Sequence, residues 1–177
     1  DMRIRQKSQL ELAKREKRGW EIFKRAVEQQ DNQLARVHGI WGIGQLARKD
    51  LTFAAPLLDL FKDNDPEIVA QAAKIAGDVN YNEAGSYLVP LLSHEYPRTV
   101  FFAAQALGRI GFKDAVAPIL SMLERNNDQD VYLRHAGVLA LTRIGQEGPV
   151  AALVDNPSRA LRTAAVLVLR RMKSEKV

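Results

Sequence analysis

The chain has 177 residues, of which 46% are hydrophobic and 27% are charged, and it contains no cysteine. This composition fits neither a disordered nor a fibrous protein, and it excludes disulfides, thiolate metal sites and a cysteine nucleophile. No apolar stretch approaches the roughly 20 residues that a membrane-spanning helix needs. We expect the chain to be a piece of a larger protein, because it begins with Asp1 and no signal peptide precedes its first predicted helix.

Charge is distributed unevenly along the sequence. Residues 51–96 carry two Lys or Arg and seven Asp or Glu, whereas residues 97–177 carry twelve and seven. The first thirty residues are also basic, with nine Lys or Arg against five Asp or Glu. A nucleic-acid-binding protein usually concentrates its basic residues along one track. The acidic middle therefore favours a mixed, solvated surface over a continuous track of that kind.

The strongest signal is internal repetition. When segment 99–111 (TVFFAAQALGRIG) is aligned on Gly108, five other segments fall into register, anchored at residues 13, 44, 77, 142 and 170. The successive spacings are 31, 33, 31, 34 and 28 residues, a near-constant period that is typical of a solenoid of two-helix units.

Each aligned segment predicts the second helix of a repeat, because small or apolar residues recur at the positions of 99, 103, 106, 107 and 110 with helical periodicity. In chain order, we expect these second helices near residues 3–15, 34–47, 66–77, 97–110, 130–144 and 159–172. Shorter first helices are expected between them, at about 20–30, 51–62, 84–93, 114–124 and 147–154. No segment alternates with period two, so no sheet is expected.

Proline and glycine mark the predicted helix ends. The pairs Asp65-Pro66, Tyr96-Pro97 and Asn156-Pro157 place proline where a second helix should begin, with Asp or Asn available as a cap in two of them. Gly111 and Gly145 suit the C-terminal caps of their helices.

The shared pattern Val-Arg-x-x-Ala-Ala-x-Ala-Leu-Gly-x-Ile-Gly, preceded by a short helix, resembles HEAT repeats, and among them the lyase-like subclass. The resemblance covers almost the whole chain and implies an all-α, right-handed α-solenoid of about five to six HEAT-like helical hairpins in a single array over residues 1–177. Small residues in the register of Ala103 (Gly39 and Gly137 among them) would let neighbouring helices approach closely.

A narrower resemblance concerns segments 36–48 (RVHGIWGIGQLAR), 101–108 (FFAAQALG) and 132–141 (YLRHAGVLAL). These are similar to the HEAT segment of large bacterial haem-containing, membrane-bound dehydrogenase-like proteins, in which a β-propeller precedes the repeats and a Cys-x-x-Cys-His cytochrome domain follows. The resemblance implies an exported or periplasmic parent oxidoreductase. Both modules are missing from this chain, which itself matches no catalytic or haem motif.

In an α-solenoid the second helices line the concave face, the usual binding surface. On the template helix, positions 101, 105 and 109 lie opposite the core face. Carrying them through the register predicts a lining of Gln6, Leu10, Lys14, Val37, Trp41, Gln45, Ala70, Lys74, Asp78, Phe101, Gln105, Arg109, His135, Leu139, Arg143, Thr163, Leu167 and Arg171.

We define the concave stripe as the nine of these residues that we predict to bind a partner: Trp41, Gln45, Lys74, Phe101, Gln105, Arg109, His135, Leu139 and Arg143. Aromatic residues and arginine together are typical of protein-binding hot spots. The alternative is that Trp41 and Phe101 simply pack on neighbouring helices.

Arg36, Arg134 and Arg162 share one register position, which Val69 and Val100 occupy in two other repeats. The three arginines suggest either a ladder of anion-binding groups or a structural role. In the second case each would bond a carbonyl between helices or an acid in a turn, such as Asp63, Asp65, Asp128 or Asp130.

No catalytic, metal or cofactor site is predicted. His38 and His135 lie three repeats apart, His94 falls in a turn, and none has a second ligand at helical spacing. The acidic turn of Asp63, Asp65 and Glu67 lacks the glycine and distal glutamate of a calcium loop, which favours helix capping instead.

We therefore expect a non-catalytic scaffold or protein-interaction module. Its partner would be a flanking domain of the parent chain or a separate redox partner, and the sequence gives no oligomeric state. Two alternatives remain open, a nucleic-acid-binding HEAT-like protein and a bilin lyase-like HEAT protein.

Overall fold

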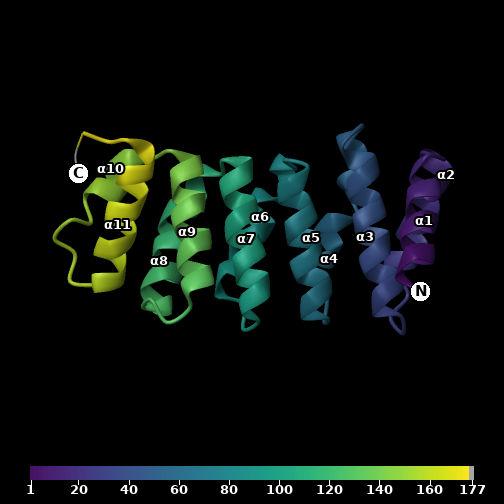
Figure 1. The fold of residues 1–177 in the computed structure, drawn as a ribbon, viewed down its shortest axis with the longest axis horizontal. Coiled ribbons are helices and arrows are strands. Elements are labelled where there is room, and N and C mark those ends of the chain that lie inside the picture. The colour runs from purple at the N-terminus through teal and green to yellow at the C-terminus, as the bar shows by residue number, and fades with distance from the viewer. Residues whose placement is uncertain (176–177) are drawn as a thin grey trace.

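The computed structural model describes residues 1–175, which form a curved row of helices. They comprise eleven α-helices and four short 3-10 helices, with no strand among the described residues. Figure 1 shows the helices standing side by side in chain order from one end of the molecule to the other. The arrangement is an α-solenoid of helical hairpins and confirms the fold class expected from the repeats.

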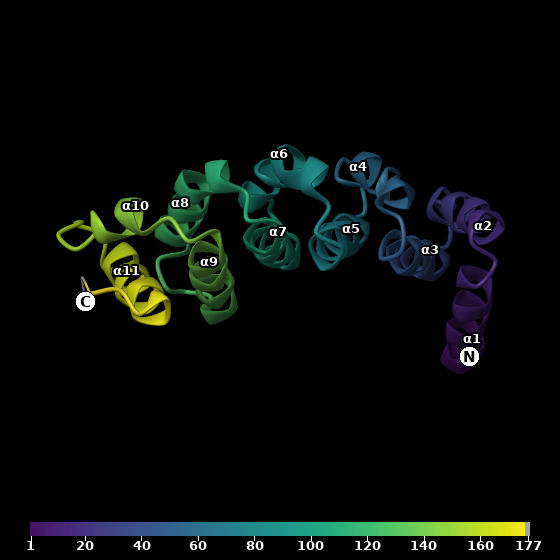
Figure 2. The ribbon, with the colours of Figure 1, turned by 90° about the horizontal axis from the view of Figure 1, so that it is seen from above.

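The helices form two rows. Figure 2 shows the inner row on the concave side of the arc and the outer row on the convex side. The inner row consists of α3 (Gln33–Ala47), α5 (Pro66–Asp78), α7 (Pro97–Ile110), α9 (Val131–Ile144) and α11 (Arg159–Met172). The outer row consists of α2 (Lys17–Val27), α4 (Leu57–Leu60), α6 (Gly85–Leu88), α8 (Val116–Asn126) and α10 (Glu147–Ala151).

Two outer helices are less regular than predicted. The expected helix over 51–62 divides into η1 (Leu51–Ala54) and α4, and that over 84–93 into η2 (Asn82–Ala84), α6 and η3 (Pro90–Ser93). Proline lies at two of these breaks, since Pro56 immediately precedes α4 and Pro90 begins η3. Proline has no amide hydrogen to continue a helical ladder. A fourth 3-10 helix, η4 (Lys113–Ala115), leads into α8.

The predicted caps are largely confirmed. Pro66 and Pro97 are the first residues of α5 and α7, and the Asp65 carboxylate accepts a hydrogen bond of 2.9 Å from the amide of Glu67. Gly111 and Gly145 end α7 and α9 with φ of 71° and 76°, a left-handed conformation that glycine adopts without strain.

The expectation that Pro157 begins the last second helix is wrong. Helix α11 begins at Arg159, and Ser158 is its N-cap. The side-chain oxygen of Asn156 accepts a hydrogen bond of 2.9 Å from the amide of Ser158. This local turn holds the backbone around Pro157 outside the helix, because asparagine readily closes such turns on a following amide.

Buried side chains of both rows form one continuous core. The inner helices come closest where glycine meets alanine. A Cβ added to Gly77 would lie 2.6 Å from Cα of Ala106, and one on Gly108 would lie 2.5 Å from Cα of Ala140. Only glycine therefore permits this spacing of α5, α7 and α9. Between α3 and α5 the equivalent partner of Gly44 is the side chain of Ile75, which separates the two backbones.

Helix α1 (Met2–Ala13) departs from the regular array. Figure 2 shows it tilted toward the concave side, where it closes the N-terminal end of the trough. Gln9 is the buried residue of this helix. The reason is visible in its register, because Glu11 and Arg15 stand where the template has Ala106 and Ile110. A face with these charges cannot be buried like that of the other second helices.

No described helix is both long enough and apolar enough to cross a membrane.

Candidate protein-binding surface

All nine residues of the concave stripe lie on α3, α5, α7 and α9 and are half-buried or exposed. Two other positions of the predicted lining are not on the surface, since Val37 is 8% exposed and Ala70 is fully buried. Helix α1 lies against α3 over Val37. The methyl group of Ala70 is too short to rise between longer neighbours, so placing both residues in the lining was wrong.

Trp41 is held in place by its neighbours although part of its ring remains accessible. Its indole Nε1 donates a hydrogen bond of 2.9 Å to Oε1 of Gln71, which is 4% exposed. The ring of His38 meets it edge to face, with centroids 5.1 Å apart. Trp41 is thus partly a packing residue, as one of the two sequence interpretations expected, and partly a surface residue.

The hydrogen bond from Trp41 continues across the next two helices. Nε2 of Gln71 donates to Glu67 at 2.7 Å, and Glu67 pairs with Nε of Arg98 on α7 at 3.0 Å. The Arg98 guanidinium lies over the ring of Phe102 at 5.1 Å from its centroid. This series of contacts ties α3, α5 and α7 together along the concave face.

Sequence reasoning did not find the linking residues of this series. The signal that could have found them is Gln71 itself, a glutamine among the alanines at 70, 72 and 73 that lies one helical turn from the core positions of Ile68 and Ile75. A buried polar side chain requires a partner, and the nearest long polar residue one turn earlier is Glu67.

Two cations of the stripe are already paired. Lys74 and Arg109 both contact Asp78 at the end of α5, the lysine at 2.6 Å and the arginine through its terminal nitrogen. The acidic middle of the chain therefore neutralises the centre of the concave face, as the charge distribution suggested.

Aromatic side chains gather between α7 and α9. Phe101 and Phe102 meet edge to face with ring centroids 5.3 Å apart, and Tyr132 at the start of α9 is 72% exposed. Together with Arg98 and Leu133 they line a cavity of about 290 Å³. Single exposed apolar residues are common, but a contiguous aromatic group beside a cavity is typical of an interaction site.

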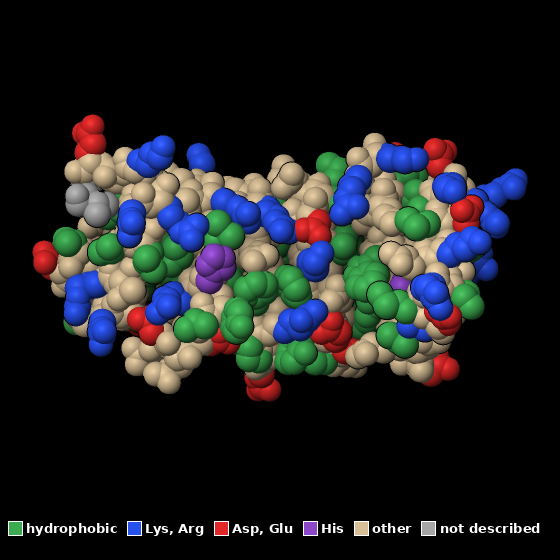
Figure 3. Space-filling model, in the orientation of Figure 1, with side chains coloured by type: hydrophobic (Ala, Val, Ile, Leu, Met, Phe, Trp, Pro, Cys, Tyr) green, Lys and Arg blue, Asp and Glu red, His purple; other side chains and the backbone are tan. Residues whose placement is uncertain are grey.

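Beside this group lies the part of the stripe with free polar groups. His135 and Arg143 are exposed, and Gln105 and Leu139 are half-buried. Among the described residues, the side chains of Gln105, His135 and Arg143 make no hydrogen bond or ion pair with another residue. Figure 3 shows the concave face, with hydrophobic side chains over α3 and α7 and Lys and Arg around them.

The repeated arginines have a structural role. Arg36 is 2% exposed, donates to the carbonyl of Val27 at 2.8 Å and pairs with Asp63. Arg134 lies 3.5 Å from Asp128, and Arg162 donates to backbone carbonyls of the preceding turn, at 2.6 Å to that of Asn156. Each arginine thus bonds a turn acid or a carbonyl, which confirms the structural interpretation over an anion-binding ladder.

The described residues contain no group of three or more His, Asp or Glu side chains placed to hold a metal ion. His38 lies on α3, His94 before α7 and His135 on α9, so the three histidines belong to different repeats.

The fold and this surface define the class of the protein, an α-solenoid of helical hairpins whose concave face carries the accessible aromatic groups. Residues 88–170 match the family model of HEAT repeats. A comparison with curated proteins gives no match.

Solved structures show the same fold. A chain from the complex of CpcE and CpcF of the phycocyanin lyase from Nostoc sp. PCC7120 superposes with a TM-score of 0.68 at 18% identity, covering 86% of this chain and 64% of that one. An engineered protein superposes with a TM-score of 0.58 at 17% identity, over 88% of this chain and 79% of the other. Another engineered protein gives 0.56 at 17% identity, over 88% and 48%. This chain thus spans less than two thirds of the phycocyanin lyase chain, and identities this low establish the fold alone.

Proposed function

We propose that the chain is a non-catalytic HEAT-repeat scaffold that binds a protein partner on its concave face, centred on the seam between α7 and α9. One observation carries the proposal. Phe101, Phe102 and the largely exposed Tyr132 surround a cavity of about 290 Å³. His135 follows Tyr132 by one turn of α9, and the free guanidinium of Arg143 lies about 12 Å further along the same helix.

The chemistry of this seam indicates the kind of partner. Interface hot spots are enriched in aromatic residues and arginine, grouped around a small pocket. Arg143 offers a positive charge about 12 Å along α9 from His135, so the partner segment would carry an apolar side chain for the cavity and a carboxylate at a distance from it. The helices are fixed by the stacked repeats, so little conformational entropy is lost when the partner binds.

The narrower sequence resemblance supports a particular partner. In proteins of that kind the helical array connects a propeller domain with a cytochrome domain, so we propose a flanking domain of a larger exported oxidoreductase as the occupant of the concave face. A separate redox partner would meet the same surface. The support for this step is the amino-acid sequence of segments 36–48, 101–108 and 132–141.

The experiment that tests partner binding is selection of peptides from a random displayed library against the intact chain, followed by calorimetry of the selected peptides. The variants are Phe101→Ala, Leu139→Ala and Arg143→Gln. We expect Phe101→Ala to weaken binding by about 2 kcal/mol, roughly thirtyfold, as truncation of a hot spot does. Selected peptides should contain an aromatic or large aliphatic residue and an Asp or Glu roughly four residues away in an extended chain.

Tyr87→Ala provides the matched control, because Tyr87 is 43% exposed and lies on α6 of the convex row. It should leave peptide affinity unchanged. Peptides that bind equally well to the three concave-face variants, or that lose affinity only with Tyr87→Ala, would contradict the proposal.

A second candidate function follows from the similarity to the phycocyanin lyase complex. HEAT-like lyases attach bilins to phycobiliproteins, and this chain shares their repeat type. The support is the fold, because the similarity rests on 18% identity. Transfer of a bilin to an apo-phycocyanin acceptor by the purified chain would establish this function, and absence of any adduct would remove it.

Nucleic-acid binding is the other alternative, and the paired cations argue against it. Lys74, Arg98 and Arg109 each pair with an acid on α5, which interrupts a basic track along the concave face. Binding to DNA that falls steeply with salt would support it. No binding at low salt would exclude it.

A further inference from the structure

A second cavity lies between α1 and α3, away from the seam of the proposed partner site. Its volume is about 260 Å³. Leu10 on α1 and Leu34, Val37 and Trp41 on α3 supply an apolar wall, while no Asp or Glu lines it. The ring of Trp41 gives this wall a flat aromatic surface. A concave, mostly apolar space with a few polar groups is the usual form of a small-molecule site.

Two polar atoms of the cavity residues are buried without a hydrogen-bond partner. They are Nε of Arg5, a donor, and Oε1 of Gln45, an acceptor. These are the two buried side-chain polar atoms among the described residues that lack a partner. An unsatisfied buried polar group typically costs about 1–3 kcal/mol. Both residues line the cavity, so a ligand that draws these two side chains toward it would satisfy the two atoms.

Arg5 is also a cation without a carboxylate. None of the ion pairs among the described residues includes it, although Arg3 on the same helix lies 3.9 Å from Asp1. The nearby histidine adds no second charge at neutral pH. Burial, followed by the positive charge of Arg5, lowers the pKa of His38. Its Nδ1 lies 2.8 Å from the amide oxygen of Gln9 and so carries the hydrogen that it donates.

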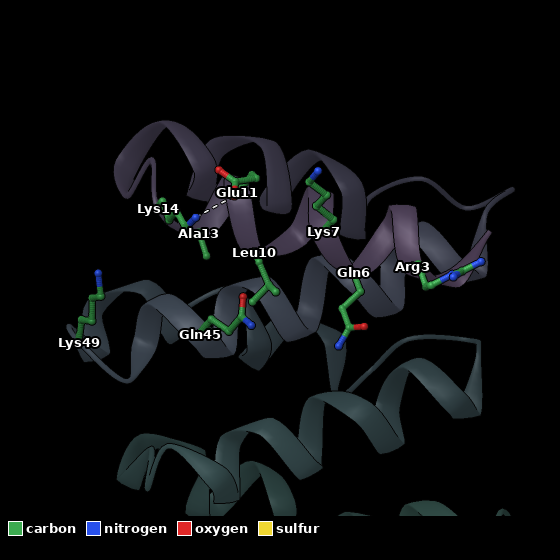
Figure 4. Close-up of a pocket in the computed structure, with 9 residues that line it drawn as sticks. All are labelled: Arg3, Gln6, Lys7, Leu10, Glu11, Ala13, Lys14, Gln45 and Lys49. Atoms are coloured by element: carbon green, nitrogen blue, oxygen red, sulfur yellow. Dashed lines mark hydrogen bonds and ion pairs between the residues drawn. The ribbon is translucent and has the colours of Figure 1, made fainter.

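The cavity continues into a wider groove with an excess of positive charge. Figure 4 shows this groove between α1 and α3, where Gln6 and Leu10 point toward α3 and Gln45 lies opposite. Gln6, Leu10 and Gln45 line both spaces. Four cations line the groove, Arg3, Lys7, Lys14 and Lys49, and one acid, Glu11, which is paired with Lys14 at 2.7 Å. Acids at its edge lie about as far as an ion pair extends from two others, Asp1 at 3.9 Å from Arg3 and Glu16 at 4.0 Å from Lys49. A cleft lined by one sign of charge raises the local concentration of ligands of the opposite sign.

We propose that this cavity binds a small aromatic carboxylic acid that also carries one hydroxyl or N–H donor. The carboxylate would accept from Arg5, the donor would meet Gln45, and the ring would lie against Trp41 and Val37. A volume of about 260 Å³ accommodates roughly nine non-hydrogen atoms, at the share of about 30 Å³ that a water molecule takes in the liquid. The site does not depend on the protein-binding function proposed above.

The test uses 4-hydroxybenzoate as the probe, with benzoate and 4-hydroxybenzamide as its comparison ligands. Benzoate lacks the hydroxyl donor and 4-hydroxybenzamide lacks the negative charge. Titrations of the intact chain are followed by the NMR signal of the Trp41 indole N–H, assigned with Trp41→Phe. We expect 4-hydroxybenzoate to bind roughly tenfold more tightly than either comparison ligand, since each lost contact is worth about 1.4 kcal/mol.

Three variants separate the two contacts. Arg5→Gln should weaken 4-hydroxybenzoate about tenfold and leave 4-hydroxybenzamide unchanged. Gln45→Leu should remove the preference for 4-hydroxybenzoate over benzoate while the carboxylate is still required. Arg18→Gln is the matched control, because Arg18 is an exposed arginine on α2 that lines neither space. It should change no affinity.

Circular dichroism of each variant shows whether α1 still folds. Because Gln45 lies on α3, its variant tests the site even where Arg5→Gln disturbs α1. The proposal is overturned if 4-hydroxybenzoate produces no shift up to about 10 mM. Equal affinity for the acid and the amide in the unchanged protein, or an unchanged preference in both folded variants, would overturn it as well.

Discussion

Arg36 on α3 reaches both carboxylate oxygens of Asp63, a residue 27 positions further along the chain in the turn before α5. The same side chain donates to the carbonyl of Val27, the last residue of α2. One arginine thus joins the end of an outer helix, the start of an inner helix and the entry to the next repeat. The side chain of Asp63 is 11% exposed, so the pair is largely shielded from water.

Asp63→Ala should destabilise the protein by about 3 kcal/mol, because it leaves the Arg36 guanidinium buried without its counter-charge. Urea unfolding measures the change in the free energy of unfolding. Arg134→Ala is the control, since Arg134 is 33% exposed and lies 3.5 Å from Asp128. This variant should lose less than about 1 kcal/mol. Similar losses of unfolding free energy in both variants would show that burial does not make the Arg36–Asp63 pair more important to stability than the exposed Arg134–Asp128 pair.

The Arg36–Asp63 pair also predicts how the stability of the fold depends on pH. Burial alone would raise the pKa of Asp63, but hydrogen bonds from Arg36 and the Asp65 amide and the charge of Arg36 outweigh it, so the pKa is lowered. A lowered pKa stabilises the fold above the unfolded value of about 3.9, and the contribution is lost as the pH falls through the folded value.

Asp63→Asn removes this titration. Between pH 5 and strongly acidic solution, the unchanged protein should therefore lose more of its free energy of unfolding than the variant loses. Urea titrations of both proteins across that range measure the difference. Parallel curves for the two proteins would mean that Asp63 does not contribute to the acid sensitivity.

Trp41 and Gln71 should be energetically coupled. Trp41→Phe removes the donor and leaves the amide oxygen of Gln71, which is 4% exposed, without its partner. We expect a loss of about 1–3 kcal/mol for this variant. In a double-mutant cycle with Gln71→Leu, the double variant should be more stable than the sum of the two single losses predicts. Additive losses would show that the hydrogen bond does not set the position of the indole.

Gly108→Ala should destabilise the array by about 1–3 kcal/mol, since the added methyl would lie 2.5 Å from Cα of Ala140 and would push α7 and α9 apart. Val166→Ala is the control, because Val166 lies inside α11 and is 53% exposed, so the change does not alter the packing between helices. There the change should be neutral or stabilising by up to about 1 kcal/mol. Thermal unfolding of both variants measures the contrast.

The repeat architecture could be predicted from the sequence because each inner helix repeats the same small and apolar positions. Gly108 and its counterparts fix the register, and Pro66, Pro97, Gly111 and Gly145 fix helix ends by local stereochemistry alone. The end of the array was less predictable. Asn156 closes a turn that delays α11 beyond Pro157, and this depends on one side-chain hydrogen bond.

The candidate surfaces were harder to predict than the helices. The register placed Trp41 and Phe101 on the concave side, but it could not show that Trp41 is tied to Gln71, because that contact joins residues 30 positions apart. It also could not anticipate the cavity beside Arg5. That space exists because α1 tilts away from the array, and the tilt follows from charges at Glu11 and Arg15 whose effect depends on three-dimensional packing.

The difference between the glycine–alanine contacts and the glycine–isoleucine contact has a mechanical consequence for the trough. At Gly77–Ala106 and Gly108–Ala140 one backbone rests on the next, so these layers resist sliding, whereas at Gly44 the branched chain of Ile75 fills the gap and can change rotamer. Bending of the array should therefore concentrate between α3 and α5, like a joint between two stiff segments. A ligand that widens or narrows the trough would act chiefly at that joint, and the indole of Trp41 spans it.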